Sequence, residues 1–131
     1  MSIRDSFVLR LLSVFFALIL LSGLTCKRLE THPEKIGFDL SELDEEGLST
    51  QAGGKVSVDY EFCIPAKEDL AKAVQSIDPS VQIQKKAKGR IECNKNQWLC
   101  LGNTHQKDYK DILLRLTVLE YVERIEQAFF E

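Results

Sequence analysis

The 131-residue sequence lacks every common signature of a reaction or a nucleotide site. It contains no glycine-rich phosphate loop, no H-E-x-x-H zinc motif, no G-x-S-x-G nucleophile elbow and no C-x-x-C pair for thiol chemistry. No internal repeat occurs at the periods typical of solenoids. The formal net charge is −3 and the isoelectric point about 5.5, so no cationic field is present to attract nucleic acid. These absences predict a protein that is not an enzyme, needs no cofactor and does not bind nucleic acid.

Long hydrophobic runs are also absent, apart from one short run near the start of the chain. Residues 11–21 are almost entirely apolar and carry no charge; Arg4 and Arg10 precede them, and Cys26 comes after a few small and mildly polar residues. This order is that of a secretory signal. Spanning a bilayer takes about twenty apolar residues, and the run reaches that length only by including Arg10, which costs about 2.5–3.5 kcal/mol near a helix centre. The sequence therefore predicts that the rest of the chain is exported.

The end of this segment resembles the lipobox of bacterial lipoprotein precursors, in which the final cysteine becomes acylated. That family usually has leucine three residues before the cysteine and glycine or alanine directly before it. Here Gly23 and Thr25 occupy those places, which makes the lipobox a relaxed one. The resemblance covers the first fifth of the chain and implies a signal peptide over residues 1–25, lipidation of Cys26 and attachment by several acyl chains, because a single chain anchors only marginally. An uncleaved membrane anchor and a plainly secreted protein remain open, in that order.

Charge divides the rest of the chain into two parts. Residues 27–54 contain three basic and seven acidic side chains, whereas residues 55–131 contain twelve of each. Gly53 and Gly54 form a natural flexible joint between them. We therefore predict a lipid-anchored, solvated acidic tether over residues 26–54, with one short helix around residues 41–46, and a folded domain over residues 55–131.

Periodicity predicts the elements of that domain. Apolar and polar residues alternate strictly over residues 55–64, which predicts a strand with one buried face. Helical spacing predicts one helix from Pro65 to about Ile77 and another after Asn103, whose spacing to Gln106 is that of a capping box. Further strands are predicted around residues 81–91, interrupted by a basic stretch, and over residues 98–101 and 121–130.

The predicted order is β-α-β-β-α-β, the ferredoxin-like arrangement of an α+β fold. It consists of a four-stranded antiparallel sheet with two helices on one face and leaves the other face open. The first and third strands then lie side by side in the centre of the sheet.

Four cysteines are present, and lipidation of Cys26 would leave three. In an oxidising compartment these allow one bridge and one free thiol. A two-residue turn at residues 96–97 would place Cys93 opposite Cys100, and we favour this pair. A tight turn at residues 88–89 would instead bring Cys63 to Cys93.

A metal site is the alternative use of these residues. Cys63, Cys93, Cys100 and His105 supply three thiolates and one imidazole, which suit zinc. Their spacings are unlike the usual short chelate loops, and the thiols would have to stay reduced outside the cytoplasm, so we predict a disulfide and no metal.

Two features are candidates for a binding face. Trp98 and Cys100 are two residues apart in a predicted strand, so their side chains point to the same face of the sheet. That face is the open one if Leu99 and Leu101 face the helices. An aromatic ring there can serve as a binding platform. The second feature is a basic cluster at one hairpin end, which predicts either an anion contact, such as a lipid headgroup or an acidic glycan, or a solvated loop that discourages edge pairing. The basic cluster consists of Lys85, Lys86, Lys88 and Arg90.

The leading hypothesis is a small non-enzymatic lipoprotein, anchored to a membrane of the bacterial cell envelope on its periplasmic side or at the cell surface. Its partner would be another envelope protein or a cell-wall glycan. Residues 99–102 with residues 109–116 resemble the second half of SPOR domains, although Cys63-Ile64-Pro65 replaces the small residues usual after the first strand of that family. This resemblance implies peptidoglycan binding through the sheet face that carries Trp98. A free-standing module like a protease inhibitor is a third possibility. An acylphosphatase-like hydrolase would need an arginine-bearing phosphate cradle after the first strand, which residues 64–67 lack.

Overall fold

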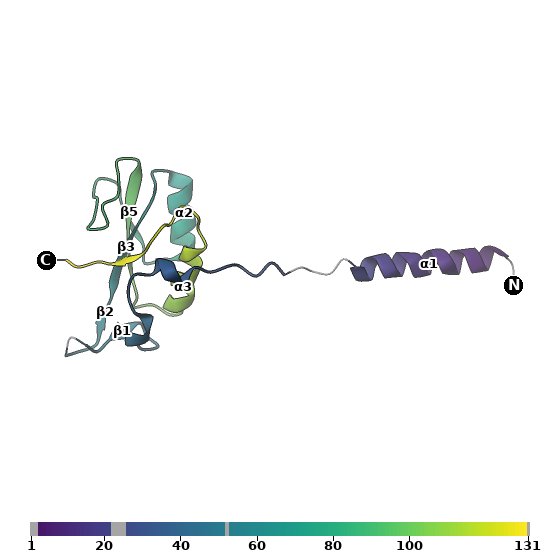
Figure 1. The fold of residues 1–131 in the computed structure, drawn as a ribbon, viewed down its shortest axis with the longest axis horizontal. Helices are drawn as coiled ribbons and strands as arrows, with labels where there is room; N and C mark the ends of the chain where they lie inside the picture. Colours follow the sequence, from purple (N-terminus) through teal and green to yellow (C-terminus); the bar gives the residue numbers. More distant parts are fainter. Residues whose placement is uncertain (1–2, 22–25, 52, 131) are drawn as a thin grey trace.

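The computed structural model describes residues 3–21, 26–51 and 53–130. Helix α1 (Ile3–Leu21) comes first, and residues 26–31 run without helix or strand into a domain of short elements (Figure 1). The elements of that domain are η1 (Pro33–Lys35), η2 (Leu40–Glu42), β1 (Leu48–Ser49), β2 (Val56–Ser57), β3 (Asp59–Pro65), α2 (Glu68–Ile77), β4 (Gln82–Gln84), β5 (Gln97–Asn103), α3 (Tyr109–Thr117) and β6 (Glu126–Gln127).

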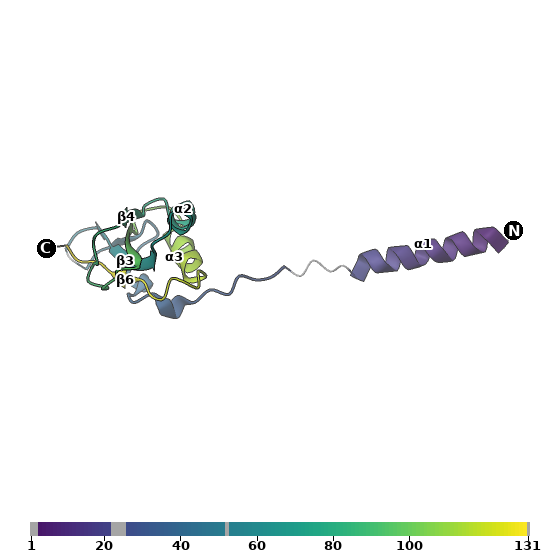
Figure 2. The same ribbon diagram turned by 90° about the horizontal axis from the view of Figure 1, so that it is seen from above.

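The main sheet has the strand order β4-β5-β3-β6, and every pair in it is antiparallel. The predicted neighbours β3 and β5 lie in the centre and pair along their full length, from Asp59 opposite Asn103 to Pro65 opposite Gln97. Helices α2 and α3 lie together on one side of this sheet (Figure 2). The α+β class, the four strands and the central pair are therefore confirmed.

The core lies between the central strands and the two helices. Tyr60, Phe62 and Ile64 of β3 are completely buried on the helix side, as their alternation with polar residues predicts. Val74 of α2 and Leu113 of α3 are buried in the same cluster. Burying a large apolar side chain is worth about 1.5–3 kcal/mol, so this cluster dominates the stability of the domain.

Several predicted boundaries are wrong for local reasons. Pro65 is the last residue of β3 rather than the start of a helix, because it still pairs with Gln97, and α2 begins only at Glu68. The second helix begins at Tyr109, well after the predicted capping box; the amide of Gln106 does donate to the Asn103 carbonyl, 2.9 Å away, but as part of a turn before the helix. The helix expected around residues 41–46 is only the short turn η2, and the last strand is limited to β6.

The largest difference between the prediction and the structure concerns the tether predicted over residues 26–54, because residues 32–49 pack as part of the folded domain. The backbone N–H of His32 donates to Oγ1 of Thr117 over 2.9 Å, and Nζ of Lys35 donates to the carbonyls of Thr117 and Leu119 over 2.9 and 3.2 Å. Ile36 forms a parallel bridge with Ile125, alongside β6. These contacts fasten the segment to the end of α3, so only residues 26–31 remain as a tether.

The middle of the acidic segment is fixed to the domain mainly by its few apolar side chains. Leu43 is buried in the main core, and Phe38 packs its ring 6.2 Å from that of Tyr60. The hydroxyl of Thr104 donates to the carbonyl of Gly47 over 2.6 Å. Most of the acidic side chains of this segment stay at the surface, which explains why its composition predicted a solvated spacer.

Candidate binding site beside the disulfide

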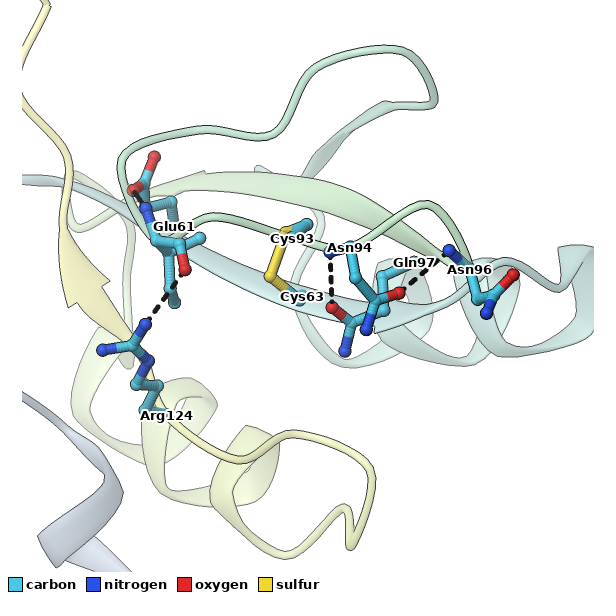
Figure 3. The surroundings of a disulfide bond; sticks show 8 residues. Glu61, Cys63, Cys93, Asn94, Asn96, Gln97 and Arg124 are labelled. Atoms are coloured by element: carbon cyan, nitrogen blue, oxygen red, sulfur yellow. Dashed lines mark hydrogen bonds between the residues drawn. A yellow bond between two sulfur atoms is a disulfide. The ribbon is translucent and has the colours of Figure 1, made fainter.

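The structure contains one disulfide among its described cysteines, and it joins Cys63 to Cys93 with their Cα atoms 5.6 Å apart (Figure 3). The favoured pair Cys93–Cys100 is therefore wrong, and the alternative pair is the one present. The reason is strand parity: Cys100 lies opposite Phe62 and points with it into the helix-side core, whereas Cys63 lies opposite Leu99 and faces the other side of the sheet.

The residues between β4 and β5 fold back over that second face. Ile91 and Cys93 are buried there against Leu99, and together they form a second small core. Gly89 has a φ of +66°, and a Cβ atom there would lie 2.7 Å from Oε2 of Glu61 and 2.8 Å from Cδ1 of Leu99. The sheet face that was predicted to be open is therefore covered in part, over Cys63 and Leu99, by the loop of residues 85–96, which we call the covering loop.

The covering loop is held at Ile91 from both sides. The backbone N–H of Ile91 donates to Oε1 of Glu61 over 2.6 Å, and the carbonyl of Ile91 accepts from Nη2 of Arg124 over 2.9 Å (Figure 3). Glu61 is only 4 % exposed, and the N–H of Ile91 partners its carboxylate. With the disulfide two residues further on, these bonds fix the loop on the sheet.

Trp98 does not lie on an open sheet face. It is paired with Ile64 in the ladder and packs against the helix-side core, so the assignment of faces to Trp98 and Leu99 was the reverse of the actual one. Nζ of Lys85 lies 4.4 Å from the centre of the indole ring and also forms an ion pair with Glu68 of α2. Trp98 is thus half-buried on the helix side, beneath a paired lysine.

The predicted basic cluster is divided between two places. Lys85 turns toward α2, whereas the guanidinium carbon of Arg90 lies 5.9 Å from the ring centre of Phe129. Lys86 and Lys88 lie between them and are exposed. Arg90 therefore lies at the C-terminal aromatic residues, and Lys85 belongs to the helix side.

The alternative zinc site is not assembled. Two of its ligands are consumed by the Cys63–Cys93 bond, Cys100 is enclosed in the opposite core, and His105 is exposed on the turn before α3. Across residues 3–21, 26–51 and 53–130, no three His, Cys, Asp or Glu side chains are grouped closely enough to hold a metal ion.

A polar cleft of about 250 Å³ opens beside the disulfide. Asn94 and Gln97 are fixed at its edge, since the N–H of Asn94 donates to Oε1 of Gln97 over 3.0 Å and Oδ1 of Asn94 accepts from the N–H of Asn96 over 2.9 Å (Figure 3). Partial burial raises the pKa of Tyr121, with Cys100 and Asp69 adding to the effect, so the phenol stays protonated. The cleft is lined by Cys63, Ile91, Glu92, Asn94, Gln97, Tyr121, Glu123 and Arg124.

The chemistry of this polar cleft is that of hydrogen bonding. Its amide, carboxylate, guanidinium and phenol groups provide donors and acceptors for hydroxyl or amino groups. Its one cysteine, Cys63, is part of the disulfide and so has no thiol that could act as a nucleophile. The cleft can hold a small polar ligand, and it offers no activated group for a covalent step.

A buried polar network at Asp78 was not predicted from the sequence. Asp78 is completely buried and accepts hydrogen bonds from the hydroxyl of Tyr60, from Nε2 of Gln106 at 3.0 Å and from the N–H and hydroxyl of Ser80 at 3.0 and 2.7 Å. Burial, reinforced by this carboxylate, raises the pKa of Tyr60 and raises that of Cys100 to about 12. The Asp-Pro-Ser sequence signals the local turn, but partners 18 and 28 residues away leave no local signal.

The export signal is described only in part. Cys26 is exposed, but Gly23 and Thr25 of the relaxed lipobox lie outside the described residues. Among the helices that the structure describes, none combines the length and hydropathy needed to cross a membrane. No protein-family model, curated protein or solved structure matches this chain.

Proposed function

We propose that the chain is a non-enzymatic lipoprotein of the bacterial cell envelope, in which a compact domain serves as an interaction module. The observation that carries the proposal is the order of its first residues: a cationic start, an apolar run without charge and then Cys26. The Cys63–Cys93 bond supports it, because disulfides persist in oxidising compartments outside the cytoplasm.

We further propose that the domain is ferredoxin-like. The support is the succession β3-α2-β4-β5-α3-β6 together with the strand order β4-β5-β3-β6. In this arrangement one sheet face is covered by α2 and α3 and part of the other by the covering loop, which leaves the loops, the strand ends and the rest of the second face for function.

The short tether defines how the domain would be presented. Residues 26–31 can extend over about 20 Å at roughly 3.5 Å per residue. His32 and Lys35 then fasten the chain to the end of α3. An acylated Cys26 would therefore hold the domain close to the membrane, with the tether leaving from a fixed point.

A cell-wall glycan is the second candidate partner, and the polar cleft favours it because amide and carboxylate groups hydrogen-bond sugar hydroxyls. This differs from the SPOR-like mode, which would use the sheet face carrying Trp98, now packed on the helix side. Pull-down on purified cell wall tests the candidate: Asn94→Ala with Gln97→Ala should lose binding, while Trp98→Ala should keep it where the fold is intact. Absence of binding by the wild type would remove the glycan.

Labelling with palmitate tests the anchor. The wild-type chain should incorporate the label, and globomycin should cause the unprocessed precursor to accumulate. Cys26→Ser should abolish the labelling and leave the precursor unprocessed with or without globomycin. Cys100→Ser is the matched control, since it removes a thiol that the fold buries. A mature chain that retains residues 1–25 and carries no fatty acid would overturn the proposal.

A further inference from the structure

We infer that an exposed aromatic surface, formed by Phe129 and Phe130 beside Leu99 and Leu101, docks an acidic segment of a partner protein that inserts an apolar side chain. We call Lys86, Lys88 and Arg90 its basic rim, because Arg90 lines the hollow at this surface and the two lysines are exposed on the same stretch of the covering loop. The inference names a class of partner for the proposed interaction module. Its orientation argument rests on the proposed anchoring through Cys26, whereas the aromatic surface itself does not.

The first observation is a hollowed apolar surface. Phe129 is 57 % exposed and Phe130 67 % exposed, although they follow each other directly after the buried Ala128. A hollow of about 380 Å³ opens next to them and is large enough for one or two aliphatic side chains. It is lined by Glu61, Gln84, Ala87, Gly89, Arg90, Leu99, Leu101, Phe129 and Phe130. Contiguous exposed apolar patches of this kind mark interaction sites.

The second observation is that the aromatic surface is held in place. The N–H of Ala128 donates to the carbonyl of Asp59 over 2.8 Å, which fixes the chain directly before the two phenylalanines. Arg90 lies over the ring of Phe129. The covering loop, which forms another wall of the hollow, is fastened by the Cys63–Cys93 bond and by the hydrogen bond from Ile91 to Glu61. A surface organised in this way loses little conformational entropy on binding.

The third observation concerns charge. Residues 85–90 include four basic side chains and no acidic one. Arg90 lines the hollow, and Lys86 and Lys88 are exposed on either side of Ala87, which also lines it. The carboxylate of Glu61 at the base of the hollow is buried and bonded to Ile91, so it offers little charge to a ligand. The charge complementary to this rim is negative, and like charges brought together across an interface oppose binding. Self-docking of two such surfaces would bring their basic rims together, so a second copy is disfavoured.

The fourth observation is the position of the aromatic surface relative to the tether. Residues 26–31 leave the domain beside α3, whereas the C-terminal residues lie at the opposite end of the domain (Figures 1 and 2). A tether of about 20 Å is too short to wrap the domain and turn this end toward the anchoring bilayer. An anchored chain would therefore hold the aromatic surface away from its own membrane, toward a protein partner.

Peptide binding to the exported chain tests the inference. The chain is held in nanodiscs of neutral lipid, or in buffer where palmitate labelling shows no acylation, and empty nanodiscs serve as the blank. The probe is a fluorescein-labelled peptide of alternating Glu and Leu, compared with the same peptide carrying Lys for Glu. Fluorescence anisotropy should detect binding of the acidic peptide alone, weakening as salt is added.

Two pairs of variants locate the binding. Phe129→Ser with Phe130→Ser should reduce affinity about tenfold or more, while Val56→Ser, at an exposed apolar residue elsewhere, should change it less than about twofold. Lys86→Glu with Lys88→Glu should also reduce affinity about tenfold, whereas Lys72→Glu with Lys107→Glu, equal in charge, should not.

Every contrary outcome overturns the inference. The proposed acidic partner would be rejected by any of three results: equal binding of both peptides, no binding of either, or binding that neither test pair of variants changes. Self-association in sedimentation that the phenylalanine variants abolish would identify a second copy as the occupant. Binding to vesicles of anionic lipid, lost in the same variants, would identify a membrane. Failure of palmitate labelling with intact peptide binding would reject the anchor and keep the aromatic surface.

Discussion

The hydroxyl of Tyr60 donates a hydrogen bond to Oδ2 of Asp78, and both side chains are completely buried. Through this contact the central strand β3 is joined to the turn between α2 and β4. Gln106, which precedes α3, donates to the other oxygen of the same carboxylate. One buried acid therefore connects three parts of the domain that are distant in sequence.

Asp78→Ala should destabilise the domain by about 1–3 kcal/mol, because it leaves buried donors without their acceptor. Urea unfolding followed by circular dichroism measures the change. Tyr60→Phe should cost less, since it removes one donor and leaves the carboxylate with its other partners. Ser76→Ala is the control on an exposed helix position. A midpoint for Asp78→Ala equal to that of the control would contradict this account.

Removing the disulfide through Cys63→Ser with Cys93→Ser should cost about 2–4 kcal/mol. Hydrogen exchange should rise mainly in the covering loop, because the loss releases it from the sheet, while the central strands stay protected. The control is Cys100→Ser, which should leave the loop unchanged. Uniform exchange across the domain would show that the bond stabilises more than the loop.

The thiol of Cys100 should resist alkylation in the native protein at pH 8 and react quickly once the protein is unfolded. Burial, with Asp78 adding to it, raises the pKa of Cys100 from 9.0 to about 12, and only the thiolate is reactive. A raised pKa in the folded state stabilises the protein fully below pH 9, and this contribution is lost as pH rises toward 12. Cys100→Ala should therefore flatten the fall in stability over that range, as measured by urea unfolding at several pH values. An equal fall in both proteins would argue against the effect.

Gly89→Ala should loosen the covering loop. The substitution places a methyl group against Glu61 and Leu99 at a positive φ, which strains the backbone by about 1–3 kcal/mol. Thermal unfolding measures the loss. Gly54→Ala, where nothing lies within 4 Å, should be neutral or slightly stabilising. Equal effects at both glycines would contradict the close approach at Gly89.

Lys35→Met tests whether the acidic segment belongs to the domain. It keeps the aliphatic stem but removes the charged donor to the carbonyls of Thr117 and Leu119, at a cost of about 1.5–3 kcal/mol. Limited proteolysis should then cut residues 32–49 faster than in the wild type. Lys72→Met, on an exposed helix position, provides the comparison. A segment cut equally fast in all three proteins would be a free tether after all.

The central sheet was predictable because its signals are local. Alternation over residues 60–64 identifies a strand with one buried face, and the succession of strands and helices gives the central pair β3 and β5. Parity alone, however, says only that Trp98 and Leu99 point to opposite faces. Which face the helices cover depends on the packing of Cys100 and Ile64, and the prediction chose the wrong one.

The candidate site was less predictable because it depends on long-range contacts. The sequence of the covering loop predicts a solvated basic hairpin end. Only two of its residues, Ile91 and Cys93, are apolar side chains that the fold buries against the sheet. The composition of the acidic segment predicts a spacer because charged residues dominate it, while four apolar residues, Ile36, Phe38, Leu40 and Leu43, supply its packing. In both segments a few buried apolar side chains determine the packing, although most of the residues are polar.

The parallel bridge between Ile36 and Ile125 has a mechanical consequence. A load applied at Cys26 would reach the domain at His32, where the Lys35 contacts and the two hydrogen bonds at Ile125 resist it together. Ile125 lies shortly before the two phenylalanines on the same segment, so the bridge also connects the anchored end of the domain to the end that carries the hollow. Tension between an anchored Cys26 and a partner held at that hollow would therefore pass through this segment.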